Sequence, residues 1–218
     1  MKRGEAMKDF PVFTTEYGVA SLMLREIPYR ADAYVVIQSS ETPEELLQEC
    51  ISFCRICGAE RVFARGHSYL EKYPVHCTVL NMRGIARVDE AQVRMLWPVT
   101  EENVGKWRAL LNERMKGVDH AATLERSAER EILASNGAYF VHEEQKVIGA
   151  GWICDGELRL IAATERAAGQ RVLHTLFSAG PEQELCLQVA STNDRAIRLY
   201  ERNGFIKTWE RYRWYRVF

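Results

Sequence analysis

The sequence has no long apolar run, no excess of charge of either sign, and little glycine or proline. Its 218 residues carry 29 Lys and Arg against 30 Asp and Glu, a formal net charge of −1. That balance provides no global field for nucleic acid or an anionic membrane. The longest apolar runs reach about six residues, whereas a membrane helix needs about 20. With 14 Gly and 6 Pro, a fibrous or low-complexity chain is also excluded.

The beginning of the chain carries no targeting signal that we can identify. Met1–Lys8 is charged and leads into no apolar segment of the kind found in secretory signals. We therefore expect a soluble, cytoplasmic protein with neither membrane nor nucleic-acid partners. The 47% hydrophobic content is typical of a folded protein. At about 150 residues per domain, the length corresponds to roughly 1.5 domains.

The six cysteines include one spaced group, Cys50-x3-Cys54-x2-Cys57. This spacing resembles the cluster-binding motif of radical SAM enzymes. It also places the three thiols on one face of a helix. The segment Pro43–Cys57 favours that helix, with Thr42 as N-cap and Gly58 at its end. Its predicted buried stripe is Leu46, Leu47, Cys50, Cys54 and Cys57. We favour buried thiols over a cluster, and no Cys/His group with zinc spacing is present elsewhere, so no metal site is predicted.

The first half of the chain alternates strand and helix signals. Strands are expected over 17–27, 33–38, 60–64 and 75–82, and helices over 43–57 and 67–73. The polar segment Arg83–Glu90 is the best candidate for a border. We therefore divide the chain into domains at 1–88 and 89–218.

The second half has a more regular order of elements. An extended segment at 93–98 precedes helices from 100 to 115 and from 122 to 133. Three strands follow over 138–142, 147–154 and 157–163. After them come a helix opening at Gly169, a strand over 184–190, a helix over 195–202, and strands over 205–209 and 212–218. This order predicts an α+β fold with a mixed, predominantly antiparallel sheet.

The segment Asn193–Phe205 contains the pattern N-x-x-A-I-x-L-Y-E-x-x-G-F. It resembles the late helix and following strand of the GNAT superfamily of acyl-CoA-dependent N-acyltransferases. The order of elements from about Val93 onward is similar to that fold as well. The resemblance implies a GNAT domain that uses acetyl-CoA as acyl donor for a small-molecule or protein amine. A homodimer is one assembly that it allows.

The resemblance also implies where the donor binds. Acyl-CoA would lie between the splayed strands 157–163 and 184–190, and its pyrophosphate would contact the start of the next helix. Independently, a helix N-terminus offers free N–H donors and about half a positive charge. The candidate donor-binding residues are Ile161, Ala162, Ala163, Arg166, Ala167, Ala168, Gly169, Gln170, Arg171, Asn193 and Tyr200.

The phosphate loop departs from the family pattern Q/R-x-x-G-x-G/A. In the register that we prefer, Thr164 replaces Gln or Arg, Ala167 replaces the first glycine, and Gly169 is the last. A second register begins at Arg166. Arg166 and Arg171 could supply charge to the phosphates. An ordinary helix start with a solvated arginine is the alternative.

Tyr200 matches the tyrosine that serves as general acid in the family. A phenol with a pKa of about 10 keeps its proton at neutral pH, so the resemblance implies that Tyr200 protonates the leaving thiolate. The alternative is a core aromatic residue. Asn193 resembles a donor-contacting Asn and is equally well explained as an N-cap.

The general base is left open. Glu157, His142 and His120 are the candidates, and a water chain could replace them. Gln188 and Ser191 could line the acceptor pocket.

The first half repeats the strand and helix order of the second without its chemistry. Laying Tyr69–Val75 on Leu199–Phe205 places Leu70 where Tyr200 stands, and no glycine loop precedes Pro43. We interpret 1–88 as a degenerate GNAT-like lobe.

Two other classes of function compete with an N-acetyltransferase. One is a catalytically weak or inactive CoA-binding or regulatory protein with a GNAT fold, which the altered loop favours. The other is nucleic-acid binding by Lys207–Arg216, where basic and aromatic residues alternate. That alternation is equally typical of a half-buried terminal strand, and we favour the strand.

Overall fold

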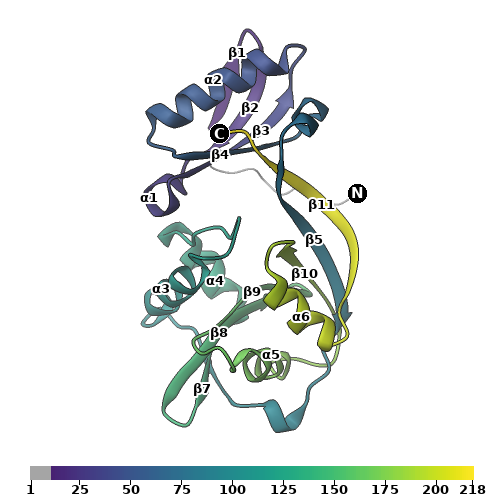
Figure 1. Ribbon diagram of the computed structural model, residues 1–218. Helices are drawn as coiled ribbons and strands as arrows, with labels where there is room; N and C mark the ends of the chain where they lie inside the picture. The colour runs from purple at the N-terminus through teal and green to yellow at the C-terminus, as the bar shows by residue number, and fades with distance from the viewer. Residues whose placement is uncertain (1–10) are drawn as a thin grey trace. The chain divides into compact units, whose positions relative to one another are not determined.

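The computed structural model describes residues 11–218, which form two compact units (Figure 1). The first unit contains the described residues up to Thr78 together with Tyr212–Phe218, and the second is Val79–Arg211. Two strands, β5 (Val75–Ile85) and β11 (Ile206–Arg216), run from one unit into the other. The units are therefore not two consecutive stretches of chain. The predicted domains, 1–88 and 89–218, are consecutive in the sequence and so differ in kind from these units. That division stays a prediction.

The first unit is a sheet with one long helix packed on it. Its elements are β1 (Val12–Thr15), β2 (Gly18–Met23), α1 (Ile27–Arg30), β3 (Asp32–Ser39), α2 (Pro43–Ile56), β4 (Arg61–Arg65), the 3-10 helix η1 (Ser68–Lys72), the start of β5 and the end of β11. The strand order is β1-β2-β3-β4-β11, in which β3 and β4 are parallel and the other pairs antiparallel.

Helix α2 begins at Pro43 as predicted and ends at Ile56, and Thr42 occupies the N-cap position without forming a side-chain cap hydrogen bond. Pro43 lies in the first turn, and Gly58 follows the helix with φ +96°, a conformation that glycine adopts without strain. Cys50 and Cys54 are fully buried, which confirms the buried-thiol interpretation for these two. The prediction for Cys57 is wrong. It is exposed and lies at the C-cap, just beyond the last helical residue, Ile56.

The second unit contains the remaining elements. These are the 3-10 helix η2 (Glu90–Gln92), β6 (Met95–Pro98), α3 (Val104–Met115), the 3-10 helix η3 (Arg126–Ala128), α4 (Glu129–Ser135), β7 (Ala138–Glu143), β8 (Lys146–Cys154), β9 (Glu157–Ala163), α5 (Gly169–Phe177), β10 (Glu184–Ala190) and α6 (Asp194–Arg202). The strand order is β5-β10-β9-β8-β7-β6, and only β9 and β10 are parallel. The mixed, mostly antiparallel α+β fold is confirmed.

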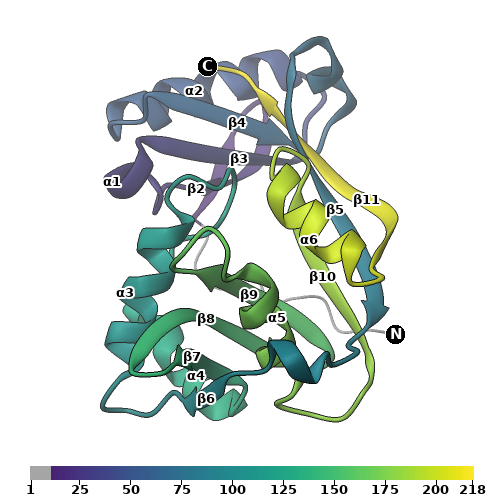
Figure 2. The same cartoon turned by 60° about the horizontal axis from the view of Figure 1, so that its bottom comes forward.

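Two cores cover the two faces of this second sheet. Helices α5 and α6 pack on one face with Val172, Leu176 and Ile197, and α3 packs on the other with Trp107 and Leu111 (Figure 2). Two glycines of β8 set how closely α5 approaches. A Cβ on Gly149 would lie 2.4 Å from Val172, and one on Gly151 would lie 2.3 Å from Leu176. The glycines therefore let α5 rest directly on the backbone of the sheet.

Four sequence expectations differ from the structure. The predicted strand to Ile27 ends at Met23, and α1 occupies 27–30 because Pro28 favours the first turn of a helix. The helix predicted over 122–133 begins only with η3 and α4. Strand β5 extends to Ile85, three residues into the predicted polar border Arg83–Glu90. The two predicted terminal strands are the single strand β11, since no turn interrupts the alternation between Trp209 and Tyr212.

Within residues 11–218, no helix is both long enough and apolar enough to cross a membrane. The same described residues contain no group of three or more His, Cys, Asp or Glu placed to hold a metal ion. Met1–Lys8, on which the targeting prediction rests, lies outside the described residues.

Candidate functional site

The parallel strands β9 and β10 separate soon after they meet. Their pairing covers only two positions, Cys186 with Glu157 and Leu187 with Leu158. Beyond Leu158, β9 continues to pair with β8 on its other edge. The edge of 159–163 that faces β10 therefore has no strand partner within the described chain. Its backbone N–H and C=O groups are open to an extended ligand.

A bulge in β9 lies next to this separation. Trp152 of β8 pairs with Leu160 and Ile153 pairs with Leu158, so Arg159 is the extra residue. A bulge bends its strand and increases the local twist. This bend accounts for the divergence of β9 from β10, and no pattern in the sequence predicts it.

The loop 164–168 leads from the open edge to the start of α5. Ala168 is the N-cap, and no side chain caps the helix. The first helical hydrogen bond of α5 runs from Val172 N–H to Ala168 C=O at 2.9 Å. The N–H groups of Gly169, Gln170 and Arg171 therefore precede the first intrahelical bond and face the end of the helix. Free N–H donors at the positive end of a helix dipole can bind an anion.

The predicted donor-binding residues of β9 and the loop differ in burial and in the face of the sheet on which they pack. Ile161 and Ala163 pack toward α5 and α6, whereas Ala162 belongs to the core under α3. In the loop, Arg166 and Ala167 are exposed and Ala168 is fully buried.

Three polar contacts fix the loop and the first turn of α5. The Arg195 guanidinium of α6 donates to the carbonyl of Arg166. The Gln170 side-chain carbonyl accepts from Asn203 Nδ2 at 2.9 Å. The Arg171 guanidinium pairs with Glu143 at 3.3 Å. Sequence reasoning missed both Arg195 and Glu143, because Arg195 occupies a variable position of the Asn193–Phe205 pattern and Glu143 lies in no motif.

Tyr200 and Asn193 lie on α6, beside α5. Tyr200 is 6% exposed and contacts Phe205, with ring centroids 6.0 Å apart. Burial raises the pKa of its phenol above the ordinary value. The Asn193 side chain accepts from Ala196 N–H at 3.1 Å, so its N-cap role is confirmed. The side-chain NH2 of Asn193 is not used by this cap.

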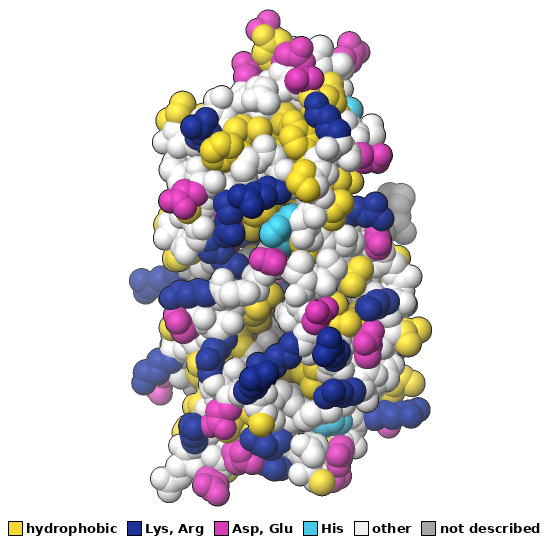
Figure 3. Space-filling model, in the orientation of Figure 1, with side chains coloured by type: hydrophobic (Ala, Val, Ile, Leu, Met, Phe, Trp, Pro, Cys, Tyr) yellow, Lys and Arg dark blue, Asp and Glu magenta, His cyan; other side chains and the backbone are white. Residues whose placement is uncertain are grey.

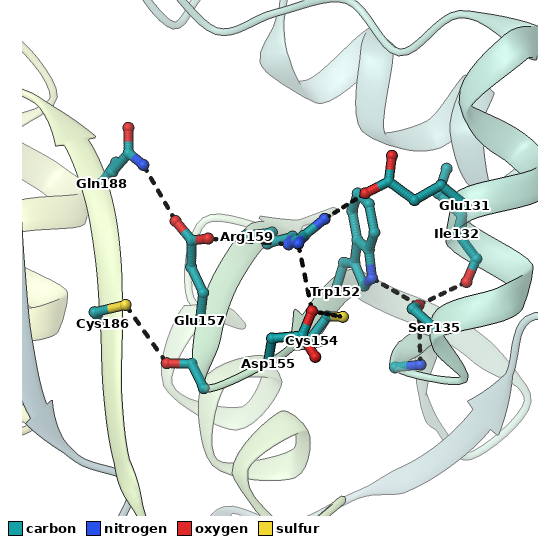
Figure 4. A network of polar contacts seen from close by, with 12 residues as sticks. Glu131, Ile132, Ser135, Trp152, Cys154, Asp155, Glu157, Arg159, Cys186 and Gln188 are labelled. Atoms are coloured by element: carbon teal, nitrogen blue, oxygen red, sulfur yellow. Dashed lines mark hydrogen bonds and ion pairs between the residues drawn. The ribbon is translucent and has the colours of Figure 1, made fainter. Parts of the chain in front are cut away.

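A polar network surrounds the point where β9 and β10 separate (Figure 4). Gln188 Nε2 of β10 donates to Glu157 Oε1 of β9 at 3.2 Å, which bridges the two strands. Arg159 stacks over Trp152, 4.7 Å from the ring centroid, and pairs with Glu131 at 2.7 Å. Its guanidinium also lies 3.9 Å from Glu157. Glu157 is thus a carboxylate held at the gap between the strands.

The other base candidates lie elsewhere. His142 is on β7, which β8 separates from β9, and it packs on Trp97 with centroids 4.8 Å apart. Burial lowers the pKa of His142. His120 lies between α3 and α4. Ser191 directly follows β10, next to the N-cap of α6.

Basic side chains gather around the helices of this site. Figure 3 shows Lys and Arg over α5 and α6, interspersed with acidic residues. On α6, Arg195, Arg198 and Arg202 are exposed. A separate cavity of about 370 Å³ lies at the opposite, amino ends of β9 and β10, between the β8–β9 turn and the end of α5. It does not contact the loop 164–168.

No protein-family model and no curated protein sequence matches the chain. Several solved structures match it. A GCN5-related N-acetyltransferase from Sphaerobacter thermophilus matches with a TM-score of 0.53 at 12% identity, over 91% of this chain and 75% of that one. The chain has the GNAT fold.

Two further solved structures match almost the whole chain. A GNAT-family acetyltransferase from Colwellia psychrerythraea matches with a TM-score of 0.51 at 13% identity, over 94% of this chain and 84% of that one. A conserved protein of unknown function from Staphylococcus epidermidis matches with a TM-score of 0.55 at 10% identity, over 97% and 94%. At these coverages, each match includes residues of both units.

Proposed function

We propose that this GNAT-fold protein is an N-acetyltransferase that transfers an acetyl group from acetyl-CoA to an amine by direct attack. The observation that carries the proposal is the open edge of β9 leading to the uncapped start of α5. An edge strand followed by a helix N-terminus matches a ligand with amides at one end and phosphates at the other, which is the chemistry of CoA.

The pantetheine arm would lie along 159–163, where its amides extend the ladder that β10 leaves incomplete. Ile161, Ala162 and Ala163 would line this stretch. The pyrophosphate would receive hydrogen bonds from the backbone of 167–171. Arg166, which is exposed in the loop, would add charge.

Tyr200 would act on the leaving thiolate. A thiol has a pKa of about 8.5 and an unperturbed phenol about 10. Burial raises the pKa of Tyr200 further. The phenol therefore holds its proton more firmly than a thiol does. A hydrogen bond from Tyr200 that stabilises the thiolate is better supported than complete proton transfer, and the final proton would come from water.

The acceptor amine would approach at the polar network around Glu157. That carboxylate lies where the strands separate, is held by Gln188, and is the strongest base candidate by position. The amine could be part of a small molecule or of a protein.

The second candidate function is a CoA-binding protein without turnover. The alanine at 167 in place of a glycine favours it. The two functions share the donor site and differ only at Tyr200 and the acceptor side.

The deciding experiment combines binding and turnover. We expect acetyl-CoA to raise the melting temperature in proportion to occupancy. Thiol release with a panel of amines should fall about 100-fold in kcat in Tyr200→Phe, the size expected for losing one hydrogen bond to the developing thiolate, with little change in acetyl-CoA affinity. Binding without turnover for any amine would favour the second function. No binding of any acyl-CoA would reject both.

A further inference from the structure

Two arginines share one carboxylate beside the first turn of α5. Arg94 Nε lies 2.5 Å from Glu143 Oε1, and Arg171 Nη2 lies 3.3 Å from Glu143 Oε2. The three side chains are 24–32% exposed, so the pairs are partly shielded from solvent. Two positive charges against one negative charge leave this cluster with a net charge of +1.

Arg94 is held much more firmly than Arg171. Its Nη1 also donates to the carbonyls of Ala91 and Val93, at 3.0 and 2.9 Å, and its backbone N–H donates to Thr175 Oγ1 at 2.8 Å. Among residues 11–218, the Arg171 guanidinium has only the 3.3 Å contact with Glu143, and its Nε is buried there without a hydrogen-bond partner. Releasing Arg171 would leave Glu143 still neutralised by Arg94.

Arg171 is also placed to reach an anion at the end of α5. It is the third residue of the helix, and side chains on a helix tilt toward the N-terminus. Its charge already acts on the loop, because it contributes, after Lys146, to lowering the pKa of Glu165.

We propose that Glu143 is a latch that holds Arg171 away from the donor phosphates, and that Arg94 sets how firmly it holds. The inference rests on the proposed function. When the pyrophosphate of CoA arrives, Arg171 leaves Glu143 for the phosphate, and Glu143 stays with Arg94. Glu143 thereby limits donor affinity, and Arg171 is the phosphate-binding arm.

The test is calorimetric titration with two probes, CoA and inorganic pyrophosphate, at low salt. Glu143→Gln should tighten both by about three- to tenfold, since Arg171 is no longer restrained. Arg171→Gln should weaken both by a similar factor. Arg94→Gln should weaken both by about twofold, because Glu143 then holds Arg171 alone. The double variant Glu143→Gln/Arg171→Gln should behave like Arg171→Gln.

Glu144→Gln is the matched control, since it makes the same charge change at the exposed neighbouring residue and should leave both affinities within about twofold. Equal effects of Glu143→Gln and Glu144→Gln would overturn the latch, as would an effect of Glu143→Gln that persists without Arg171. The opposite shifts in affinity expected for Glu143→Gln and Arg94→Gln exclude simple loss of folding.

The two probes separate the latch from the proposed function. If the variants change pyrophosphate affinity in the expected order and CoA does not bind, the proposed function fails while the latch stands. If neither probe binds, both fail.

Discussion

At the scale of single residues, burial decides which reactive groups can react. Cys50 and Cys54 are fully buried on α2, and burial raises the pKa of each thiol to about 12. Only the thiolate is nucleophilic, so these two act as small apolar residues. Cys57, three residues further on, is exposed. The spacing that resembles a cluster motif therefore belongs to a helix packed on a sheet.

We expect alkylation to distinguish the three thiols. At pH 8 iodoacetamide should modify Cys57 within minutes, and Cys50 and Cys54 only at the rate at which the first unit opens. Because the folded pKa lies above the ordinary value of 9.0, the unfolded state loses these protons first. The free energy of unfolding should therefore decrease as pH rises above about 9. Mass spectrometry of peptides from 43–58 measures the labelling. Equal rates for all three cysteines would contradict the buried arrangement.

At the scale of elements, the start of α5 carries the proposed function. Gly149 and Gly151 fix the helix on β8, Arg195 ties the loop to α6, and the bulge at Arg159 opens the path that leads to the loop. The sequence indicated the helix and its glycine. It did not indicate how these elements meet, because the glycine and Arg195 contacts join residues more than 20 positions apart and the bulge depends on strand register.

Ala167→Glu tests whether an anion binds at this helix start. A unit negative charge about 4 Å from a phosphate costs about 1 to 4 kcal/mol, depending on the local dielectric. We expect CoA affinity to fall at least about tenfold, measured by calorimetry. Ala167 is exposed, so the melting temperature should be unchanged.

Ala109→Glu is the control for that variant. It adds the same charge at an exposed position of α3 and should leave CoA affinity unaltered. Equal loss in both variants would show that charge alone, and not the site at α5, determines the affinity.

At the scale of the whole molecule, the two halves follow the same sequence of elements. In each, an antiparallel hairpin (β2–β3 or β8–β9) leads through a helix (α2 or α5) to a parallel neighbour (β4 or β10). The last strand of each series then enters the sheet of the other unit. β5 pairs with β10, and the end of β11 pairs with β4. This exchange supports our proposal that the first lobe is a degenerate copy of the second.

One difference explains why only the second half would bind a donor. β3 and β4 pair over five positions, from Asp32 with Arg61 to Val36 with Arg65, whereas β9 and β10 pair over two. The parallel strands of the first unit therefore stay paired along the whole of β4, and only 37–39 of β3 extend beyond that pairing.

The exchange of β11 can be tested by comparing two aromatic residues on that strand. Tyr215 is 9% exposed in the core of the first unit, and Trp209 is 50% exposed in the second. Tyr215→Ala should lower the free energy of unfolding by about 3 kcal/mol. Hydrogen exchange should also show lost protection at Val62, which bonds to Val217 and Phe218. Trp209→Ala should lower the free energy of unfolding by less than about 1 kcal/mol. Similar costs for the two variants would contradict the different environments of the two ends of β11.

The sequence by itself determined the elements and their order. Local signals are enough for this, since apolar periodicity, proline, glycine and caps act over a few residues, as at Pro43, Gly58 and Asn193. It also indicated the region of the proposed donor site, through Gly169 and Tyr200. Only the tertiary structure decided that β9 and β10 separate, that Glu143 pairs with Arg171, that Cys57 is exposed, and that β5 and β11 change units. Each of these depends on strand register or on a contact between distant residues, and neither leaves a periodic trace in the sequence.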